Sequence, residues 1–367
     1  MAKVILHIGQ GKTGTSSLQE ALTLNRNALI QVGIYYPIPR SWPRTLRNGI
    51  ATHNGLSRAI VQRVHSGGDV AGQWSRMVAN AKRHECDTIL LSGEDFFGGH
   101  PRTWAVGEET FWRLYERKVH HVHHFFRGHH VEVVAYVREP QEWATSAAAH
   151  WIRKGPFEAD PFYFTPERFV QAVTPLLDYK RLFDTWLNPE FRWQVRLHPY
   201  ASELMRNGDI FDDFAARHLP EFDGLHHNRR RSNVALGKAA LDWLALNTDP
   251  TTPTWLSRSR EHILTKACQA DLGHLTRYEL PSEINSQLEP VYERSRRYLA
   301  HNLGMFCGDA SIVPSPPQHG SQEFALVSQA FDRRWNSLWG RKIRWSYRIR
   351  ELLRESLNRT RYSRRRT

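Results

Sequence analysis

Residues suited to binding an anion gather near the start of the 367-residue chain. The apolar run from Val4 to Ile8 predicts a strand, and an amphipathic pattern from Leu18 onward predicts a helix. The segment between them is rich in Gly, Lys and Thr. Glycines let backbone N–H groups approach an oxyanion, the helix N-terminus adds its dipole, and Lys12 adds a mobile cation. The segment therefore predicts a site for phosphate or sulfate.

The spacing of this loop does not fit a nucleoside-triphosphate loop of the Walker type. That motif has Gly, four residues and then Gly-Lys-Ser/Thr, whereas Leu6 stands five positions before Gly11. The pattern Gly-x-x-Lys-Thr-Gly-Thr-x-Ser-Leu-Gln after a strand resembles the 5′-phosphosulfate loop of sulfotransferases, especially bacterial carbohydrate-type members that begin His-Ile-Gly. The resemblance implies donor contacts from Gly9, Gly11, Lys12, Thr13, Gly14, Thr15 and Ser16.

A second stretch is similar to the same family. The β-branched run from Val131 to Val137 predicts a strand, and Pro140 suits the first turn of a helix. Arg138 stands at the strand end, and Ser146 follows eight positions later, a little over two turns into that helix. In sulfotransferases an arginine and a serine so spaced bind the 3′-phosphate of 3′-phosphoadenosine 5′-phosphosulfate. A guanidinium can hold a phosphate bidentately, which suits the role.

The acceptor of a sulfuryl group is usually a hydroxyl, and its proton must leave as the S–O bond forms. Glu94 follows a second buried strand, where ligands gather in open α/β sheets. Related sulfotransferases use a Glu or a His as the base, so we predict Glu94 in this role. The alternative is that Glu94 caps the next helix or pairs with a loop arginine. His53 is a second acceptor-side candidate, and its alternative is a surface-loop histidine.

Two further polar stretches have weaker patterns. The resemblance implies a late basic loop against the 3′-phosphate, which makes Arg231 and Asn233 candidate donor ligands; an exposed charge run is the alternative. His120 and His124 stand one helical turn apart, as metal ligands can, but no nearby Cys or carboxylate completes a familiar set. We predict a solvated helix end there, and the transfer reaction requires no metal.

The pattern of elements predicts a three-layer α/β/α protein with a central parallel sheet. The resemblance implies the P-loop NTPase-like sulfotransferase fold, with a helical C-terminal region added. Strands are expected near 3–8, 87–92, 131–137 and 191–197, and helices over 73–84, 168–186 and from 111 into a His-rich turn before 130. The expected domains are a catalytic domain at 1–308 with an irregular insertion at 33–72, a Pro/Ser/Gly linker at 309–322 and a basic tail at 323–367.

Most of the net charge is local to that tail. Residues 323–367 hold 13 Lys/Arg against 4 Asp/Glu, in a chain whose formal net charge is +13. A basic amphipathic helix is indicated by apolar residues on one face: Trp345, Ile349, Leu352, Leu353 and Leu357. Such a helix can lie on an anionic membrane or dock on the catalytic domain or a partner. With no secretory segment and only three sparse cysteines, we predict a cytoplasmic protein. A peripheral location on the inner membrane face is the alternative that applies if the tail helix lies on a membrane.

These observations predict an enzyme that moves a sulfuryl group from 3′-phosphoadenosine 5′-phosphosulfate to a hydroxyl of a glycan or small hydroxylated metabolite. A nucleotide or metabolite kinase using the N-terminal loop is one rival, and a non-catalytic protein that keeps the donor pocket is another. A basic protein that binds nucleic acid or membrane is the third. Its nucleic-acid form is disfavoured because the basic residues concentrate in the tail instead of following a groove.

Overall fold

The chain divides into two compact units. The computed structural model describes residues 2–38, 46–47, 50–66, 70–98, 107–154, 166–219, 236–247, 253–271, 278–303, 320–337, 340–346 and 348–349. The first unit comprises Met1–Trp143, Val170–Ser232 and Ser286–Ala310, and the second comprises Ala144–Phe169, Asn233–Asn285 and Ser311–Thr367. The division into a catalytic domain, linker and tail that the composition suggests stays a prediction.

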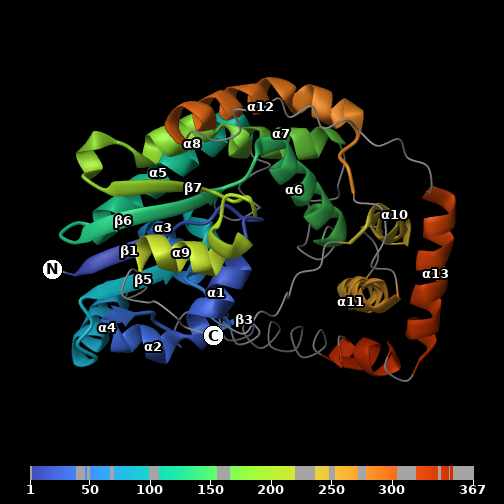
Figure 1. Ribbon diagram of the computed structural model, residues 1–367, viewed down its shortest axis with the longest axis horizontal. Helices are drawn as coiled ribbons and strands as arrows, with labels where there is room; N and C mark the ends of the chain where they lie inside the picture. The colour runs from blue at the N-terminus through green and yellow to red at the C-terminus, as the bar shows by residue number, and fades with distance from the viewer. Residues whose placement is uncertain are drawn as a thin grey trace, which may run out of the picture. The chain divides into compact units, whose positions relative to one another are not determined.

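A five-stranded, all-parallel sheet forms the centre of the first unit (Figure 1). Its strands, in the spatial order β2-β5-β1-β6-β7, are β2 (Ile34–Tyr35), β5 (Thr88–Ser92), β1 (Lys3–His7), β6 (His130–Val137) and β7 (Gln194–Pro199). A separate antiparallel pair is formed by β3 (Leu46–Arg47) and β4 (Ile50–Ala51). His7, the last residue of β1, stands opposite Ser92, the last residue of β5, and opposite Val134 of β6, which continues to Val137. The carboxyl ends of these parallel strands therefore point to the same edge of the sheet.

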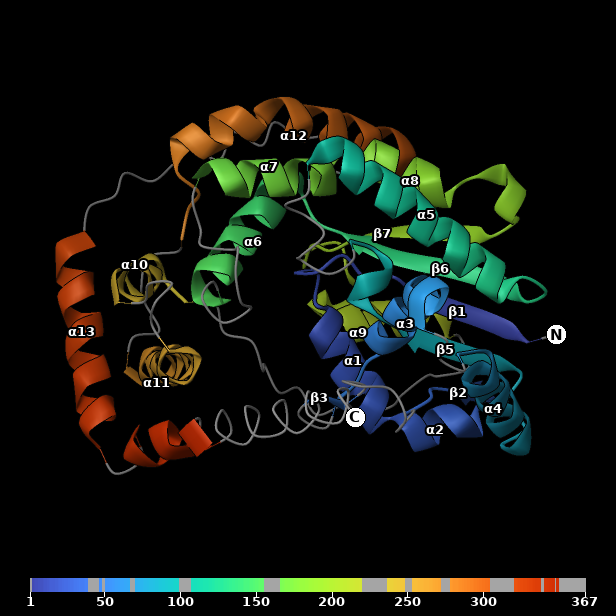
Figure 2. The ribbon, with the colours of Figure 1, turned by 180° about the vertical axis from the view of Figure 1, so that it is seen from behind.

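Helices cover both faces of this sheet. One face carries α1 (Thr15–Leu24) and α9 (Ile210–His218), and the other carries α3 (Asn54–Ser66) and α5 (Glu108–Phe126) (Figures 1 and 2). The first unit also holds α2 (Arg26–Gln31), α4 (Val70–Arg83), η1 (Glu94–Phe96), α8 (Tyr179–Trp186), η4 (Pro189–Phe191) and η5 (Arg206–Gly208). Three helices contribute residues to both units: α6 (Pro140–Lys154), α7 (Pro166–Leu177) and α12 (Ser282–Leu303).

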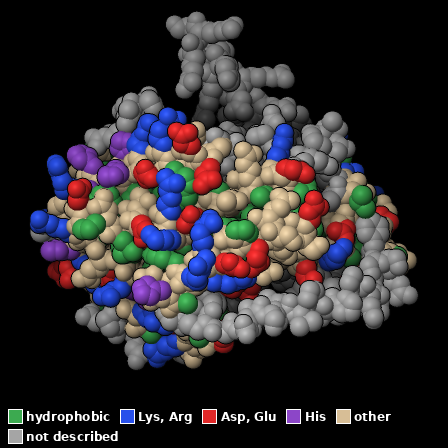
Figure 3. Space-filling model, turned by 90° about the horizontal axis from the view of Figure 1, so that it is seen from above, with side chains coloured by type: hydrophobic (Ala, Val, Ile, Leu, Met, Phe, Trp, Pro, Cys, Tyr) green, Lys and Arg blue, Asp and Glu red, His purple; other side chains and the backbone are tan. Residues whose placement is uncertain are grey.

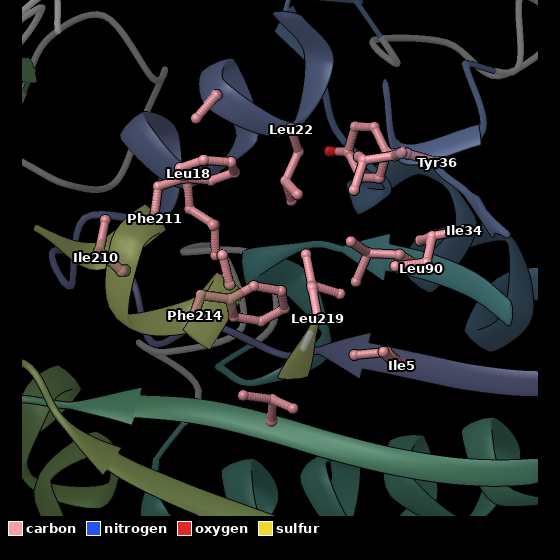
Figure 4. Packing of buried hydrophobic residues seen from close by; sticks show 14 of the residues in the cluster. Ile5, Leu18, Leu22, Ile34, Tyr36, Leu90, Ile210, Phe211, Phe214 and Leu219 are labelled. Carbon is pink, nitrogen blue, oxygen red and sulfur yellow. The ribbon is translucent and has the colours of Figure 1, made fainter. Parts of the chain in front are cut away.

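The core of the first unit lies between the sheet and the pair α1 and α9 (Figure 4). Leu18 of α1 and Phe214 of α9 pack over Ile5 of β1, and all three are fully or almost fully buried. Burying one such side chain stabilises the fold by about 1.5–3 kcal/mol. This layer fixes α1, and therefore the loop before it, on the carboxyl edge of the sheet.

The second unit has its own helical core. It contains α10 (Lys238–Asn247), α11 (Thr254–Asp271) and α13 (Gly320–Asn336), whose side chains form a second buried cluster. Trp243 of α10 and Phe331 of α13 pack with ring centroids 4.1 Å apart. The structure thus confirms two expectations from the sequence, a parallel sheet and a helical C-terminal region.

Several boundaries differ from the expected ones for local reasons. The strand expected at 191–197 is β7, which begins at Gln194 because Asn188 caps a 3-10 turn over 189–191 by accepting from the Glu190 N–H. The helix expected over 168–186 is two helices, since Asp178 caps α8 by accepting from the Arg181 N–H. The strand β2 was not predicted.

The His-rich stretch and the expected irregular insertion also differ. His120–His124 lie inside α5, which continues to Phe126, and not in a turn. Within 33–72, the expected irregular segment contains β2, the β3–β4 pair and the 13-residue α3. None of the helices in the described ranges is both long and apolar enough to cross a membrane.

The core contacts of α9 make a testable prediction about stability. We expect Phe214→Ala to lower the free energy of unfolding by about 3–5 kcal/mol, because it opens a cavity under α9. Leu24→Ala on α1 is the control, since Leu24 is 60% exposed and its truncation should change stability by less than about 0.5 kcal/mol. The measurement is urea unfolding followed by circular dichroism, and equal midpoints for the two variants would contradict the packing described.

Candidate functional site

The loop between β1 and α1 is built to present backbone N–H groups. Lys12 and Gly14 both adopt left-handed φ angles, of 73° and 69°, on either side of Thr13. Alternation of this kind turns successive N–H groups toward one side, and such concave backbone segments bind anions. Gly14 is the N-cap of α1 and supplies no side-chain cap, so the first N–H groups of the helix point toward the same place.

Close packing leaves no room for side chains at two of the loop glycines. A Cβ on Gly9 would stand 2.8 Å from Thr15 Oγ1 and 2.9 Å from His7 Cε1. A Cβ on Gly14 would stand 2.7 Å from Tyr200 Cε2, in addition to the strain of its positive φ. These contacts explain why glycine is required at both positions.

The loop carbonyls are held by hydrogen bonds from α6 and from within the loop itself. Trp143 Nε1, on the first turn of α6, donates to the Gly11 carbonyl oxygen at 2.7 Å. The Gln10 carbonyl accepts from Thr13 Oγ1 at 2.5 Å and from the Thr13 N–H at 3.3 Å. The Tyr179 hydroxyl lies 3.0 Å from Gln10 Oε1. With these carbonyls engaged, the loop can turn its N–H groups toward a ligand.

Arg138 lies at the end of β6, the strand next to β1. The same Tyr179 hydroxyl lies 3.0 Å from the Arg138 carbonyl oxygen, which ties this turn to the loop. The guanidinium lies 5.8 Å from the ring centroid of Tyr200, the tyrosine that covers Gly14. Its Nε donates to Glu142 Oε2 at 3.0 Å, which uses one of the five N–H donors of the group. Arg138 and the loop are thus brought together through Tyr179 and Tyr200.

The turn after Arg138 is anchored on its other side. Glu139 is buried, and its carboxylate accepts from the Glu142 N–H at 2.7 Å and from Arg296 Nε at 2.8 Å. Arg296 also donates to Glu289 on α12. This network fixes the start of α6. Ser146 lies further along α6, is partly buried and belongs to the second unit, so the structure places it only by its position on that helix.

Glu94 lies beside the loop at the end of β5. It begins the 3-10 turn η1, is partly buried, and its Oε2 lies 4.0 Å from where a Cβ of Gly11 would stand. The next residue is held from α3, where Asn54 Oδ1 accepts from the Asp95 N–H at 3.0 Å and Arg58 pairs with the Asp95 carboxylate. The buried ammonium of Lys118 on α5 donates to the Phe97 carbonyl oxygen. The turn that carries Glu94 is therefore held from two helices.

Burial lowers the pKa of Lys118 to about 7. Two backbone carbonyls and the Tyr115 ring surround its side-chain nitrogen, so the lysine supports the turn and is shielded from solvent. A buried amine thus holds the turn from inside the core by hydrogen bonding to backbone carbonyls.

His53 is fully buried, with both ring nitrogens engaged. Nδ1 accepts from the Ser92 N–H at 3.0 Å, and Nε2 lies 3.0 Å from the Pro37 carbonyl oxygen, to which it donates as the neutral ring. Burial lowers the pKa of His53 to about 4. The surface-loop position considered as the alternative is therefore wrong. An acceptor-side role for His53 stays a prediction, and the burial of the ring does not favour it.

The remaining candidates are placed less fully. Arg231 and Asn233 lie outside the described residues. In the described parts of the chain, no group of three or more His, Cys, Asp or Glu side chains is placed to hold a metal ion. His123, in the stretch predicted to be a solvated helix end, stacks on Phe191 with centroids 4.3 Å apart.

Sequence reasoning missed the residues that position this site. Gln10, Trp143, Tyr179 and Tyr200 all contact the loop or Arg138. Trp143 carried a usable signal, because it stands one helical turn after the strand-end motif and its indole must find an acceptor when buried. Tyr200 carried none, since only the parallel pairing of β6 and β7 brings it near Arg138.

Comparison with known proteins adds no relative: no family model, curated protein or solved structure matches this chain significantly.

Buried His53 predicts a specific pH dependence of stability. The unfolded chain binds a proton at this histidine near pH 6.5, whereas the folded chain resists protonation until about pH 4. Stability contributed by the neutral ring is therefore present above pH 6.5 and is lost as the pH falls toward 4, by on the order of 3 kcal/mol. We expect His53→Asn to reduce the slope of the unfolding free energy against pH in this range, and the slope that remains is due to the buried His7 and His198, whose pKa values are also lowered by burial.

The control is His130→Asn, because His130 is exposed at the start of β6. Urea unfolding between pH 4 and pH 7 measures both variants, and a slope in His53→Asn as steep as in the parent chain would show that another group is responsible.

Proposed function

We propose that this protein is a sulfotransferase that uses 3′-phosphoadenosine 5′-phosphosulfate as donor and a hydroxylated acceptor, of which a glycan is the best candidate. The observation that carries the proposal is the joining of two anion-binding elements at neighbouring strand ends. The loop after β1 and Arg138 after β6 share Tyr179 and Tyr200 as contacts. A donor with phosphates at both 5′ and 3′ positions needs two such elements.

The topology supports this assignment. In the order β2-β5-β1-β6-β7 the chain leaves β1 toward one side of the sheet and later returns to place β6 on the other. Ligands of open α/β sheets bind outside the carboxyl ends of the strands at such a reversal. The loop and Arg138 flank it, as expected of the P-loop NTPase-like sulfotransferase fold that we propose for the first unit.

The proposed reaction is an in-line displacement at sulfur. The acceptor oxygen forms a new S–O bond while the bond from sulfur to the oxygen of the 5′-phosphate breaks, and 3′-phosphoadenosine 5′-phosphate leaves. Negative charge grows on that leaving oxygen, where Lys12 and the N–H groups of the segment from Gly11 to Thr15 would stabilise it, apart from the Thr13 N–H, which donates to the Gln10 carbonyl. Losing one preorganised donor of this kind typically costs ~10²–10³-fold in rate.

Other residues complete the proposed donor site. The hydroxyls of Thr15 and Ser16 add contacts to the phosphosulfate, although Thr15 Oγ1 already lies against Gly9. Arg138 is the proposed ligand of the 3′-phosphate in the first unit, and Ser146, Arg231 and Asn233 stay candidate ligands on the sequence resemblance alone. Donor charge is met by these cations and the helix dipole, so the scheme needs no metal.

Glu94 is the proposed base. Its carboxylate next to the loop could take the acceptor proton as the new S–O bond forms, a role worth roughly 10²–10⁴-fold in rate. His53 is less suited because its ring has no exposed surface and both nitrogens are engaged. We propose that His53 instead supports the β5 end from which Glu94 projects.

The charge distribution argues against a nucleic-acid-binding surface on the face formed by α8 and α12. Lys and Arg side chains there alternate with Asp and Glu (Figure 3). Pairs such as Lys180 with Asp184 and Arg296 with Glu289 account for this pattern. A phosphate backbone needs a continuous run of positive charge, which this face does not offer.

Donor binding is the first test of the proposal. Isothermal titration calorimetry should show binding of 3′-phosphoadenosine 5′-phosphate, weakened by about 10–100-fold in Arg138→Ala because a charged hydrogen-bonding partner is lost. Lys12→Ala should weaken it as well. Arg181→Ala is the matched control, since Arg181 is about half exposed on α8 and pairs with Glu116.

ATP with Mg²⁺ is titrated in parallel. Binding of ATP alone, with no affinity for the 3′-phosphorylated nucleotide, would overturn the proposal and favour a kinase that uses the same loop.

We also propose that the C-terminal tail contacts an anionic membrane. Trp345 is 67% exposed and Ile349 is 45% exposed, so the described start of the apolar face is accessible. In vesicle co-sedimentation we expect pelleting with anionic but not with zwitterionic lipid, and a decrease of several-fold in a Trp345→Ser, Ile349→Ser variant. Truncation is a poorer test, because Phe331 of α13 belongs to the core of the second unit. Unchanged pelleting in the double variant would contradict the idea.

A further inference from the structure

His7 is the last residue of β1 and lies directly behind the phosphate loop. It is fully buried and faces the same side of the sheet as Ile5, toward α9. A Cβ built on Gly9 would stand 2.9 Å from Cε1 of the His7 ring and 2.8 Å from Thr15 Oγ1. The first glycine of the loop is thus packed between the imidazole and the first residue of α1.

Hydrogen bonds tie this ring to two other elements. Nδ1 lies 2.8 Å from the Ser92 hydroxyl at the end of β5. Gln19 Nε2 on α1 donates to the same hydroxyl at 3.3 Å and to the Ser92 carbonyl oxygen at 3.4 Å. A single buried network therefore joins the end of β1, the end of β5 and the helix that follows the loop.

One atom of this ring is not satisfied. Within the described residues, His7 Nε2 is buried and has no hydrogen-bond partner. Native cores rarely leave a buried polar atom unpaired, and each such group needs an explanation. An aliphatic residue would fill the layer under α9 without this cost, so core packing alone does not account for a histidine here.

We propose that His7 is a positioning residue for the loop between β1 and α1: its neutral ring, hydrogen-bonded to Ser92, which Gln19 contacts in turn, sets the place of Gly9 and thereby the direction of the loop N–H groups. This inference rests on the proposed donor-binding function. The imidazole suits the role because it is flat enough to lie against Gly9 and still reaches Ser92 through Nδ1.

The surroundings keep this ring neutral. Aromatic rings of Tyr136 and Phe214 lie with centroids 6.2 and 5.8 Å away, and burial lowers the pKa of His7 to about 3. The titratable and charged groups near this side include Lys3 on β1, Arg196 and His198 on β7, Glu132 and Tyr136 on β6, and Asp213, Arg217 and His218 on α9. His198 and His218 oppose protonation of His7, while Glu132 and Asp213 are engaged by His218 and Arg217.

The test compares two ligands that use different parts of the site. The compound 3′-phosphoadenosine 5′-phosphate needs both the loop and Arg138, whereas adenosine 3′-monophosphate has no 5′-phosphate for the loop. The variant His7→Phe keeps a flat ring but loses the hydrogen bond to Ser92. We expect it to lower the affinity for 3′-phosphoadenosine 5′-phosphate by about 10-fold or more. Affinity for the second should change less than about 2-fold, because Arg138 is untouched.

Ser92→Ala is the second variant, in case His7→Phe fails to fold. It removes the same hydrogen bond from the other side and should give the same pattern with a smaller loss, of about 3-fold or more. The matched control is Tyr115→Phe on α5, which also deletes a buried hydroxyl. That hydroxyl accepts a hydrogen bond from Trp186 Nε1 of α8, so its loss should leave both affinities unchanged.

The outcomes separate the two proposals. If the parent chain binds neither nucleotide, the proposed function fails. If it binds both and the His7 and Ser92 variants bind them equally well, or lose both equally, His7 has no positioning role toward the loop and the inference is overturned.

Discussion

The anion-binding role proposed for the loop requires that its backbone carbonyls be held away from the ligand, and side chains of α6 and of the loop itself meet that requirement. The indole of Trp143 engages the Gly11 carbonyl, and Thr13 engages the carbonyl of Gln10. With these acceptors occupied, the left-handed Lys12 and Gly14 can direct N–H groups to one point. A helix N-terminus alone attracts an anion weakly, since its dipole acts over about one turn. Trp143 of α6 and Tyr179 of α8 hold the loop in one conformation, so that its N–H groups have a defined direction.

The parallel sheet decides which side chains can reach this point. Because β1 is flanked by β5 and β6, the residues that follow these three strands share one edge, and they include the loop, Glu94 and Arg138. The next strand, β7, adds Tyr200, whose N–H donates to the Val137 carbonyl at 2.7 Å. The layer of Leu18, Phe214 and Ile5 holds α1 against the sheet and so keeps the loop at this edge. Fold stability and site geometry are therefore linked through the same helix.

Sequence reasoning located the main elements where the signal is local. The strands β1, β5 and β6 were predicted within a residue or two, because an apolar or β-branched run and a following glycine or proline mark each one. It failed where side-chain capping decides, as at Asn188 and Asp178, and where only tertiary contacts act. Tyr179 and Tyr200 lie far along the chain from the loop, and nothing in their own neighbourhood marks them. The buried state of His53 was equally invisible, since both of its partners are backbone groups.

In this site the cationic side chains lie near the surface and the neutral histidines lie in the core. This arrangement follows from the free-energy cost of burying an ion. Lys12 and Arg138 stand at the edge, where partial exposure lets them stay charged without a large desolvation cost. Behind them, the two fully buried histidines His7 and His53 have lowered pKa values, so this layer holds the loop by hydrogen bonding and shape instead of charge. A buried imidazolium would add attraction for an anion but would destabilise the layer under α9 and the end of β5. Neutral supports behind exposed cations give both a stable fold and a charged face for the ligand.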